Sequence, residues 1–240
     1  MTTQPTELSP PPPSEAGTVF GDRLDVATAY AEMLATEGTE RGLIGPREVP
    51  RLWDRHLLNC AVIQELIPNG SVVVDVGSGA GLPGLALAIA RPDLSLILVE
   101  PLLRRASWLS DVVGRLNLDG VTVRRARAEE LHGRLSVSIV TARAVAPLAR
   151  LGSWCLPLLG PEGELLAIKG DNATVEMAAS LPQLRRYGAL EASVVVAGVD
   201  VLSDPTSVVR VKVGSHGGGA PRSRPPRPPS ARRRNNEGRQ

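Results

Sequence analysis

The stretch SVVVDVGSGAGLPG, residues 71–84, predicts a buried strand followed by a glycine-rich loop. Val72–Val76 contains four valines around one aspartate, and such a β-branched run is typical of a strand covered on both faces. The glycines that follow let the backbone turn sharply and let a ligand approach without a Cβ clash. Open α/β sheets bind ligands at the carboxyl ends of their strands, where this loop lies. The stretch therefore predicts an α/β fold with a ligand-binding loop.

Strands and helices alternate after this loop. This order predicts parallel βαβ units in a doubly wound, mostly parallel sheet of seven strands, with an antiparallel pair for the last two. The expected strands are 72–76, 94–100, 121–125, 135–142, 163–169, 190–197 and 207–213, and the expected helices between them are 85–91, 102–116, 146–159 and 173–187.

The residues before the glycine-rich stretch predict a helical extension over 17–70 that precedes the α/β domain of 71–213. Phe20, Leu24, Ala27, Ala31 and Leu34 have the spacing of one helix face, and a second helix is expected from 49 to 67 after a loop over 37–48. The Pro-rich start, 1–16, and the Gly, Pro, Ser and Arg-rich end, 214–240, both predict disorder.

Positive charge is concentrated at the end of the chain. Residues 217–240 hold seven Arg and one Glu, which leaves 20 basic and 24 acidic residues in 1–216 although the whole chain has a net charge of +2. Such a tail could add salt-dependent affinity for phosphates, or it could be a dispensable solvated extension. Because the body is net acidic, binding of a nucleic acid would need a local basic patch.

Two ligand classes use a loop of this kind. The spacing Gly79-x-Gly81-x-x-Gly84 also matches the dinucleotide fingerprint, so the glycines alone do not choose between them. Asp75 favours S-adenosylmethionine, because a carboxylate suits its ammonium and sulfonium and is unfavourable beside a pyrophosphate. Pro83 also removes an N–H group that a phosphate could use. The loop therefore predicts an S-adenosylmethionine site.

Acidic residues at the next two strand ends extend this prediction. Glu100 follows the second strand, where it can accept hydrogen bonds from both ribose hydroxyls, although a dinucleotide would need the same residue. Ala128 and Glu129 follow the third strand, where methyltransferases of this topology contact the adenine. Ala-Glu-Glu is also an ordinary start for a helix, so this second assignment is open.

Other functional classes lack their signatures. Cys60 and Cys155 have no Cys or His at ligand spacing and are expected to be buried, reduced thiols, with no metal site. The start of the chain does not have the pattern of a signal peptide, and no apolar run approaches the ~18 residues of a membrane span. A cytoplasmic, monomeric protein without a membrane partner is expected.

The absence of two known motifs narrows the classes of methyl acceptor that fit this sequence. Enzymes that methylate exocyclic adenine amines usually carry an Asp/Asn-Pro-Pro-aromatic motif after the fourth strand, whereas residues 140–147 read VTARAVAP. Pyrimidine C5 methylation needs a nucleophilic cysteine in a loop at a strand end, and neither cysteine is predicted there. An acceptor with a free lone pair fits better. Guanine N7 is one, because its attack on a methyl group needs only alignment and electrostatics.

Four segments together resemble the bacterial 16S rRNA guanine-N7 methyltransferase family RsmG, also called glucose-inhibited division protein B. Their order and spacing match across about residues 20–213, and the combination is far more specific than any single piece. The segments are RHLLN at 55–59, DVGSGAGLPG at 75–84, TARA at 141–144 and AIKG at 167–170.

The resemblance implies a class I, Rossmann-like S-adenosylmethionine-dependent methyltransferase that acts on a guanine in the helix 18 loop of 16S rRNA in the small ribosomal subunit. It implies that Arg143 and Lys169 serve catalysis, with Arg143 also near the cofactor. The implied cofactor-binding residues are Asp75, Gly77, Gly79, Gly81, Leu82, Glu100, Ala128 and Glu129. The implied RNA-binding residues are Arg55, His56, Arg104, Arg105 and Lys169.

Other readings remain open at this stage. Arg143 could pair with a surface acid, and His56 could be a neutral, packed core residue. A small-molecule methyltransferase of the same fold would suit the acidic body, and it would turn over without ribosomal particles. A dinucleotide-dependent oxidoreductase would bind NAD(H), but the carboxylate of Asp75 argues against this class. A non-catalytic RNA-binding protein would tolerate the loss of Arg143 and Lys169.

Overall fold

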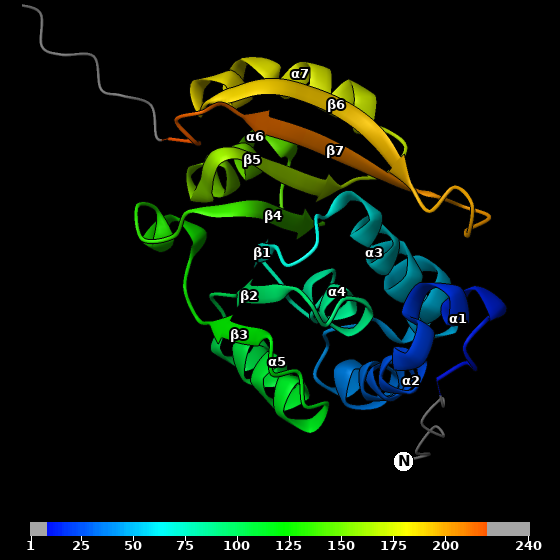
Figure 1. Ribbon diagram of the computed structural model, residues 1–240. Coiled ribbons are helices and arrows are strands. Elements are labelled where there is room, and N and C mark those ends of the chain that lie inside the picture. Colours follow the sequence, from blue (N-terminus) through cyan, green and yellow to red (C-terminus); the bar gives the residue numbers. More distant parts are fainter. Residues whose placement is uncertain (1–8, 220–240) are drawn as a thin grey trace, which may run out of the picture.

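The computed structural model describes residues 9–219 and contains one seven-stranded sheet in the order β3-β2-β1-β4-β5-β7-β6 (Figure 1). The first five strands in this order are parallel, whereas β7 is antiparallel to both β5 and β6. This confirms the expected doubly wound sheet and its antiparallel end. The strands are β1 (Val72–Val76), β2 (Ser95–Val99), β3 (Val121–Arg124), β4 (Val137–Arg143), β5 (Leu159–Ile168), β6 (Ala189–Ala197) and β7 (Thr206–Val213).

Helices cover both faces of this sheet. The α-helices are α1 (Ser14–Phe20), α2 (Leu24–Met33), α3 (Asn59–Ala61), α4 (Gly84–Ala90), α5 (Leu103–Arg115), α6 (Leu148–Cys155) and α7 (Ala173–Arg186). Shorter 3₁₀ or wider π turns extend or join them: η1 (Gly21–Arg23), η2 (Leu34–Gly38), η3 (Pro46–Arg51), η4 (Leu52–Leu58), η5 (Val62–Leu66), η6 (Ala128–Leu131) and η7 (Leu156–Leu158). No helix within the described range is long and apolar enough to cross a bilayer.

The core has two layers, one on each face of the sheet. One layer joins the N-terminal helices to α4 and α5, and Figure 1 shows α1 and α2 beside α4. The other layer packs α6 and α7 on the opposite face. Adjacent residues of β1 divide between them: Val73 belongs to the first layer and Val74 to the second. The helical extension is therefore part of the main core.

The N-terminal boundaries differ from expectation. Ser14 begins α1, so residues 14–16 are helical rather than disordered, and Ala16 is fully buried. Their burial against the core overrides the polar, Pro-rich composition that suggested disorder. The expected loop over 37–48 is also too long, because helical structure continues to Glu40 and resumes at Pro46. Residues 1–8 lie outside the described range.

The C-terminal boundary also needs correction. Residues 214–219 were expected to be disordered, but the amide of Gly218 donates to Leu159 O and that of Gly219 donates to Tyr187 O. A Cβ on Gly218 would lie 1.8 Å from the Leu156 carbonyl oxygen, so the missing side chain allows this close packing. The glycine-rich composition suggested a disordered segment, whereas these glycines allow the backbone to pack closely against Leu156 and Leu159. The Arg-rich segment 220–240 lies outside the described range.

Two smaller boundaries shift for local reasons. The helix expected from 146 begins at Leu148, because Pro147 with its extended ψ of 144° is its N-cap. Leu159, expected to end that helix, begins β5 instead, and η7 ends at Leu158. These shifts leave residues 144–147 as a loop at the carboxyl end of β4.

Candidate active site

The glycine-rich loop folds back onto the ends of the two neighbouring strands. Gly77 has a φ of +73° and its amide donates to Val99 O of β2 at 2.8 Å. A Cβ on Gly77 would lie 2.8 Å from both Cγ atoms of Val145, which follows β4. A Cβ on Gly81, with φ of +109°, would lie 2.3 Å from Leu85. Only glycine fits these two positions, which confirms the need for backbone freedom here.

Asp75 is fully buried beneath the loop. Its Oδ1 accepts from Thr141 Oγ1 at 3.0 Å, and its Oδ2 accepts from the amide of Gly84 at 3.1 Å. Burial raises the pKa of this carboxyl to about 6, although these hydrogen bonds and the charge of Arg143 act in the opposite direction. Asp75 thus holds the start of α4 against β1, and it places negative charge below the loop.

Glu100 anchors the loop from the end of β2. It is 2% exposed, its Oε2 accepts from the amide of Gly79 at 3.1 Å, and its Oε1 accepts from the amide of Leu102 at 2.9 Å. Each carboxylate oxygen has two lone pairs, so both can accept further hydrogen bonds. The geometry fits the expected ribose contact, which stays a prediction.

Two aromatic residues that sequence reasoning did not single out hold the top of the loop. Ala80 O accepts from Tyr30 Oη at 3.0 Å and from Trp108 Nε1 at 2.8 Å. Tyr30 comes from α2 and Trp108 from α5, and both are fully buried. The helical extension therefore takes part directly in shaping the predicted cofactor site.

We expect Tyr30→Phe and Trp108→Phe each to weaken S-adenosylmethionine binding by roughly fivefold, since each removes one hydrogen bond worth about 1 kcal/mol from the loop. The double variant should lose more than either single variant, because Ala80 O then has no side-chain donor. Isothermal titration calorimetry measures the dissociation constants. Tyr187→Phe on the opposite face is the matched control, and an unchanged affinity in the double variant would contradict the role of these bonds.

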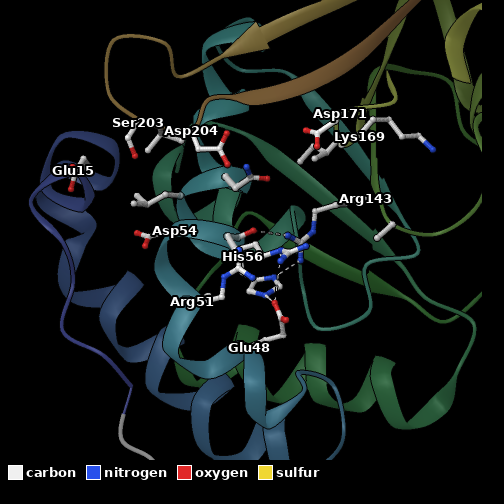
Figure 2. A pocket seen from close by; sticks show the side chains of 17 residues that line it. Glu15, Glu48, Arg51, Asp54, His56, Arg143, Lys169, Asp171, Ser203 and Asp204 are labelled. Carbon is white, nitrogen blue, oxygen red and sulfur yellow. Dashed lines mark hydrogen bonds and ion pairs between the residues drawn. The ribbon is translucent and has the colours of Figure 1, made fainter. Parts of the chain in front are cut away.

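A pocket of about 810 Å³ lies between the helical extension, the carboxyl ends of β4 and β5, and the segment that joins β6 to β7 (Figure 2). Its volume falls in the range of small-molecule and nucleotide sites. Four residues expected to be functional line it together: Arg55, His56, Arg143 and Lys169. Sequence reasoning did not select the remaining polar wall, which is Glu15, Glu48, Arg51, Asp54, Asn59, Asp171, Ser203 and Asp204.

Arg143 joins this pocket to the sheet. Its Nη1 donates to Arg55 O at 3.2 Å, and its Nη2 lies 3.0 Å from Nδ1 of His56. The other ring nitrogen of His56 lies 2.9 Å from Oε2 of Glu48, and Figure 2 shows the three side chains in a row. The Nε of Arg143 is buried without a hydrogen-bond partner among residues 9–219. Few buried donors in native proteins lack a partner.

Lys169 points away from this row and braces the loop after β4 (Figure 2). Its Nζ donates to Ala146 O at 3.1 Å and to Oε1 of Glu176 at 2.9 Å. The same carboxylate oxygen of Glu176 accepts from the amide of Leu148. Burial alone would raise the pKa of Glu176, but the hydrogen bonds from Lys169 and Leu148 lower it overall. The pair fixes residues 146–148 beside the pocket.

The other expected RNA-binding residues lie elsewhere. Arg104 and Arg105 lie in the first turn of α5, with Nη1 of Arg105 4.0 Å from Oε2 of Glu100, and neither lines the pocket. Ala128 is buried at the start of η6, whereas Glu129 is exposed. Leu82 is buried within the loop. The contacts of these residues with cofactor or RNA stay predictions.

The cysteines are placed as expected. Cys60 and Cys155 are both free and fully buried, and burial raises the pKa of the Cys60 thiol to about 11 and that of Cys155 further. Neither can act as a thiolate nucleophile at neutral pH. Within residues 9–219, no group of three or more His, Cys, Asp or Glu side chains could hold a metal ion.

The strand order, the acid at the end of β2 and the glycine-rich loop between β1 and α4 define a class I, Rossmann-like S-adenosylmethionine-dependent methyltransferase. Solved structures agree on this fold. An S-adenosylmethionine-dependent O-methyltransferase from Thermotoga maritima aligns with a TM-score of 0.52 and 14% identity over 65% of each chain. TYW2 from M. jannaschii in complex with AdoMet has a TM-score of 0.52 and 15% identity over 68% of this chain and 78% of its own.

Sequence comparison identifies the family. The family model described as rRNA small subunit methyltransferase G (GidB) matches residues 23–199. Ribosomal RNA small subunit methyltransferase G from Streptomyces avermitilis is 56% identical over 90% of this chain and 91% of its own. The protein of that name from Pseudarthrobacter chlorophenolicus is 58% identical over 81% and 90%. The chain belongs to the rRNA small subunit methyltransferase G family, and the resemblance seen in the sequence is confirmed.

Proposed function

We propose that this enzyme transfers the methyl group of S-adenosylmethionine to N7 of a guanine in the helix 18 loop of 16S rRNA in the small ribosomal subunit. The observation that carries the proposal is the pocket at the carboxyl ends of β4 and β5, whose lining includes Arg143, Arg55 and Lys169 in a chain of this family. A cytoplasmic, monomeric enzyme is part of the same proposal.

The cofactor side of the proposal rests on the loop. Gly77 and Gly81 let the loop pack closely at positions where a Cβ would clash with neighbouring side chains. Glu100 and Asp75 supply negative charge around a cationic ligand. S-adenosylmethionine supplies an electrophilic methyl group on a sulfonium. Gly79 and Glu100 would orient the nucleoside part, while Asp75 and the start of α4 hold the loop in place.

The acceptor side of the proposal rests on the pocket. Guanine N7 has a lone pair in the neutral base, so no residue has to remove a proton before attack. Arg143 is the last residue of β4, two residues after Thr141, whose hydroxyl group donates to Asp75 beneath the loop. Its guanidinium has five N–H donors, gives two of them to Arg55 O and Nδ1 of His56, and would bind and orient the target nucleotide with others. Arg51 and Arg55 would neutralise RNA phosphates at the rim.

The proposal is tested by mapping N7-methylguanine in small-subunit RNA from strains with and without the gene. We expect the methylated guanine in the helix 18 loop to be present in the first strain and absent in the second. The purified protein should restore it on isolated subunits with S-adenosylmethionine. Modification of another nucleotide would overturn the assigned position, and turnover of small molecules without subunits would overturn the substrate class.

A further inference from the structure

The protonation state of His56 follows from its two neighbours. An arginine guanidinium can only donate hydrogen bonds, so the 3.0 Å contact from Arg143 Nη2 requires a lone pair on Nδ1 of His56. The ring proton must then be on Nε2, where it can be donated to Oε2 of Glu48 at 2.9 Å. The arrangement is satisfied only by a neutral ring in this one tautomer.

We infer that His56 is a positioning residue for Arg143, acting through the ordered chain Glu48–His56–Arg143 rather than through direct contact with RNA. Glu48 fixes the tautomer and orientation of the ring, and the ring accepts from Nη2 and holds the guanidinium fork. The Arg55 carbonyl holds the other arm of the fork. The three remaining N–H groups of the guanidinium thereby keep fixed directions. The inference rests on the proposed function for its kinetic consequences, but the hydrogen-bond chain itself does not.

The burial and pairing of His56 support this role. Its side chain is 12% exposed, compared with 55% for that of neighbouring Arg55, which leaves Arg55 as the better partner for a phosphate. Both ring nitrogens already have protein partners, so none is free for a phosphate oxygen. The charged groups around the ring are Arg143 from β4, Arg55 beside it in η4, and Glu48 from η3, with Arg51 acting on Glu48.

The hydrogen-bond chain Glu48–His56–Arg143 should make the activity of the enzyme decrease at acidic pH. Burial lowers the pKa of His56 below its usual 6.5, the charge of Arg143 lowers it further, and Glu48 opposes both. The ring is therefore neutral at pH 7.5 and gains its second proton only below pH 6.5. That proton would occupy Nδ1 and face the donor and the positive charge of Arg143. Activity is expected to fall as the pH falls through this pKa.

Two substitutions of His56 separate its contact with Arg143 from its contact with Glu48. His56→Asn keeps an acceptor near the Nδ1 position but loses the contact with Glu48 and cannot titrate. His56→Gln keeps a polar group near the Nε2 position but removes the acceptor for Arg143. At pH 7.5 we expect kcat on isolated small subunits to fall about threefold for His56→Asn and roughly thirtyfold for His56→Gln, with KM for subunits nearly unchanged, because a displaced catalytic group costs rate rather than affinity.

The pH profile of kcat distinguishes positioning from RNA contact. Asp75, with its pKa of about 6, also titrates in this range and is present in every variant. The extra loss of activity in wild type relative to His56→Asn below pH 6.5 therefore measures His56. A phosphate-binding histidine would do the opposite, because its charged form would bind RNA more tightly. Equal losses for both variants, a rise in KM instead of a fall in kcat, or activation of wild type in acid would overturn the inference.

A spectroscopic measurement tests the hydrogen-bond chain Glu48–His56–Arg143 without any substrate. In protein with ¹⁵N-labelled histidine, the His56 signals, assigned with the His56→Asn variant, should show a neutral ring with the proton on Nε2 at pH 7.5. A charged ring or a proton on Nδ1 would overturn the inference. If the tautomer is as expected but wild-type enzyme does not methylate small subunits, the proposed function fails while the hydrogen-bond chain stands.

Discussion

Glu100→Ala should raise the dissociation constant of S-adenosylmethionine by roughly 100-fold, because it removes a charged acceptor worth about 1.5–3 kcal/mol from the nucleoside site. Two effects combine. The expected ribose hydrogen bonds disappear, and the amides of Gly79 and Leu102 lose the carboxylate that holds them. Calorimetric titration with S-adenosylmethionine measures the change, and thermal unfolding without ligand reports whether the fold is intact.

Glu100→Gln refines this prediction at nearly constant size. The glutamine side chain keeps one acceptor oxygen. Its NH₂ group would replace the other carboxylate oxygen and would face the backbone N–H of Gly79 or Leu102, which that oxygen accepts from in the native protein. We expect an intermediate loss of affinity, about tenfold, for a neutral donor facing a donor. Glu191→Gln, the same change at an exposed position on β6, is the control and should leave the affinity unchanged. Native affinity in folded Glu100→Ala would contradict the nucleoside role of this carboxylate.

The parts of the fold that were predicted correctly are those that local sequence determines. Val72–Val76 is β-branched and the glycines follow directly, so strand and loop are encoded within 14 residues. Periodicity predicted α5 and α7 to within a residue or two for the same reason. Composition was less reliable at the chain ends. Ala16 of α1 packs into the core and Gly218 donates to Leu159 O, and composition does not record such contacts with distant residues.

The candidate site was predicted in part for a related reason. Arg143 and Lys169 were selected by family resemblance, and strand topology explains why the ends of β4 and β5 bring them to one pocket. Tyr30 was missed because it meets Ala80 across 50 residues of chain, and its position on an apolar helix face resembled an ordinary core residue. Glu176 was missed because its partner Lys169 belongs to a strand end and not to its own helix.

The double role of Asp75 was also outside the reach of the sequence. Its predicted partner is a cationic ligand, and this contact stays a prediction. The structure shows that the carboxylate also carries hydrogen bonds from Thr141 and Gly84, so it secures the loop from below. The pairing of β1 with β4 places Thr141 opposite Asp75, and only the strand order predicts this neighbour. Local pattern identified the residue, whereas tertiary structure defined its contacts.

Arg143→Ala should lower kcat for methyl transfer to small subunits by roughly 100-fold or more, because a group that orients the target and stabilises charge is lost. Affinity for S-adenosylmethionine should fall much less than in Glu100→Ala, since no amide of the glycine-rich loop is bonded to Arg143. Steady-state transfer of a labelled methyl group to subunits from a strain lacking the enzyme measures kcat, and calorimetry measures the affinity.

Arg143→Lys tests whether charge alone is sufficient. A lysine ammonium is a compact charge without the planar fork, so it cannot reach both the Arg55 carbonyl and Nδ1 of His56 in the same geometry and still offer a third directed donor. We expect roughly a fiftyfold loss of kcat for such a displacement. Arg150→Ala, which removes an exposed guanidinium stacked on Trp154 of α6, is the matched control and should retain native rates. If Arg143→Ala kept more than about a third of the native rate, Arg143 would be a structural residue, since catalytic groups cost far more when removed.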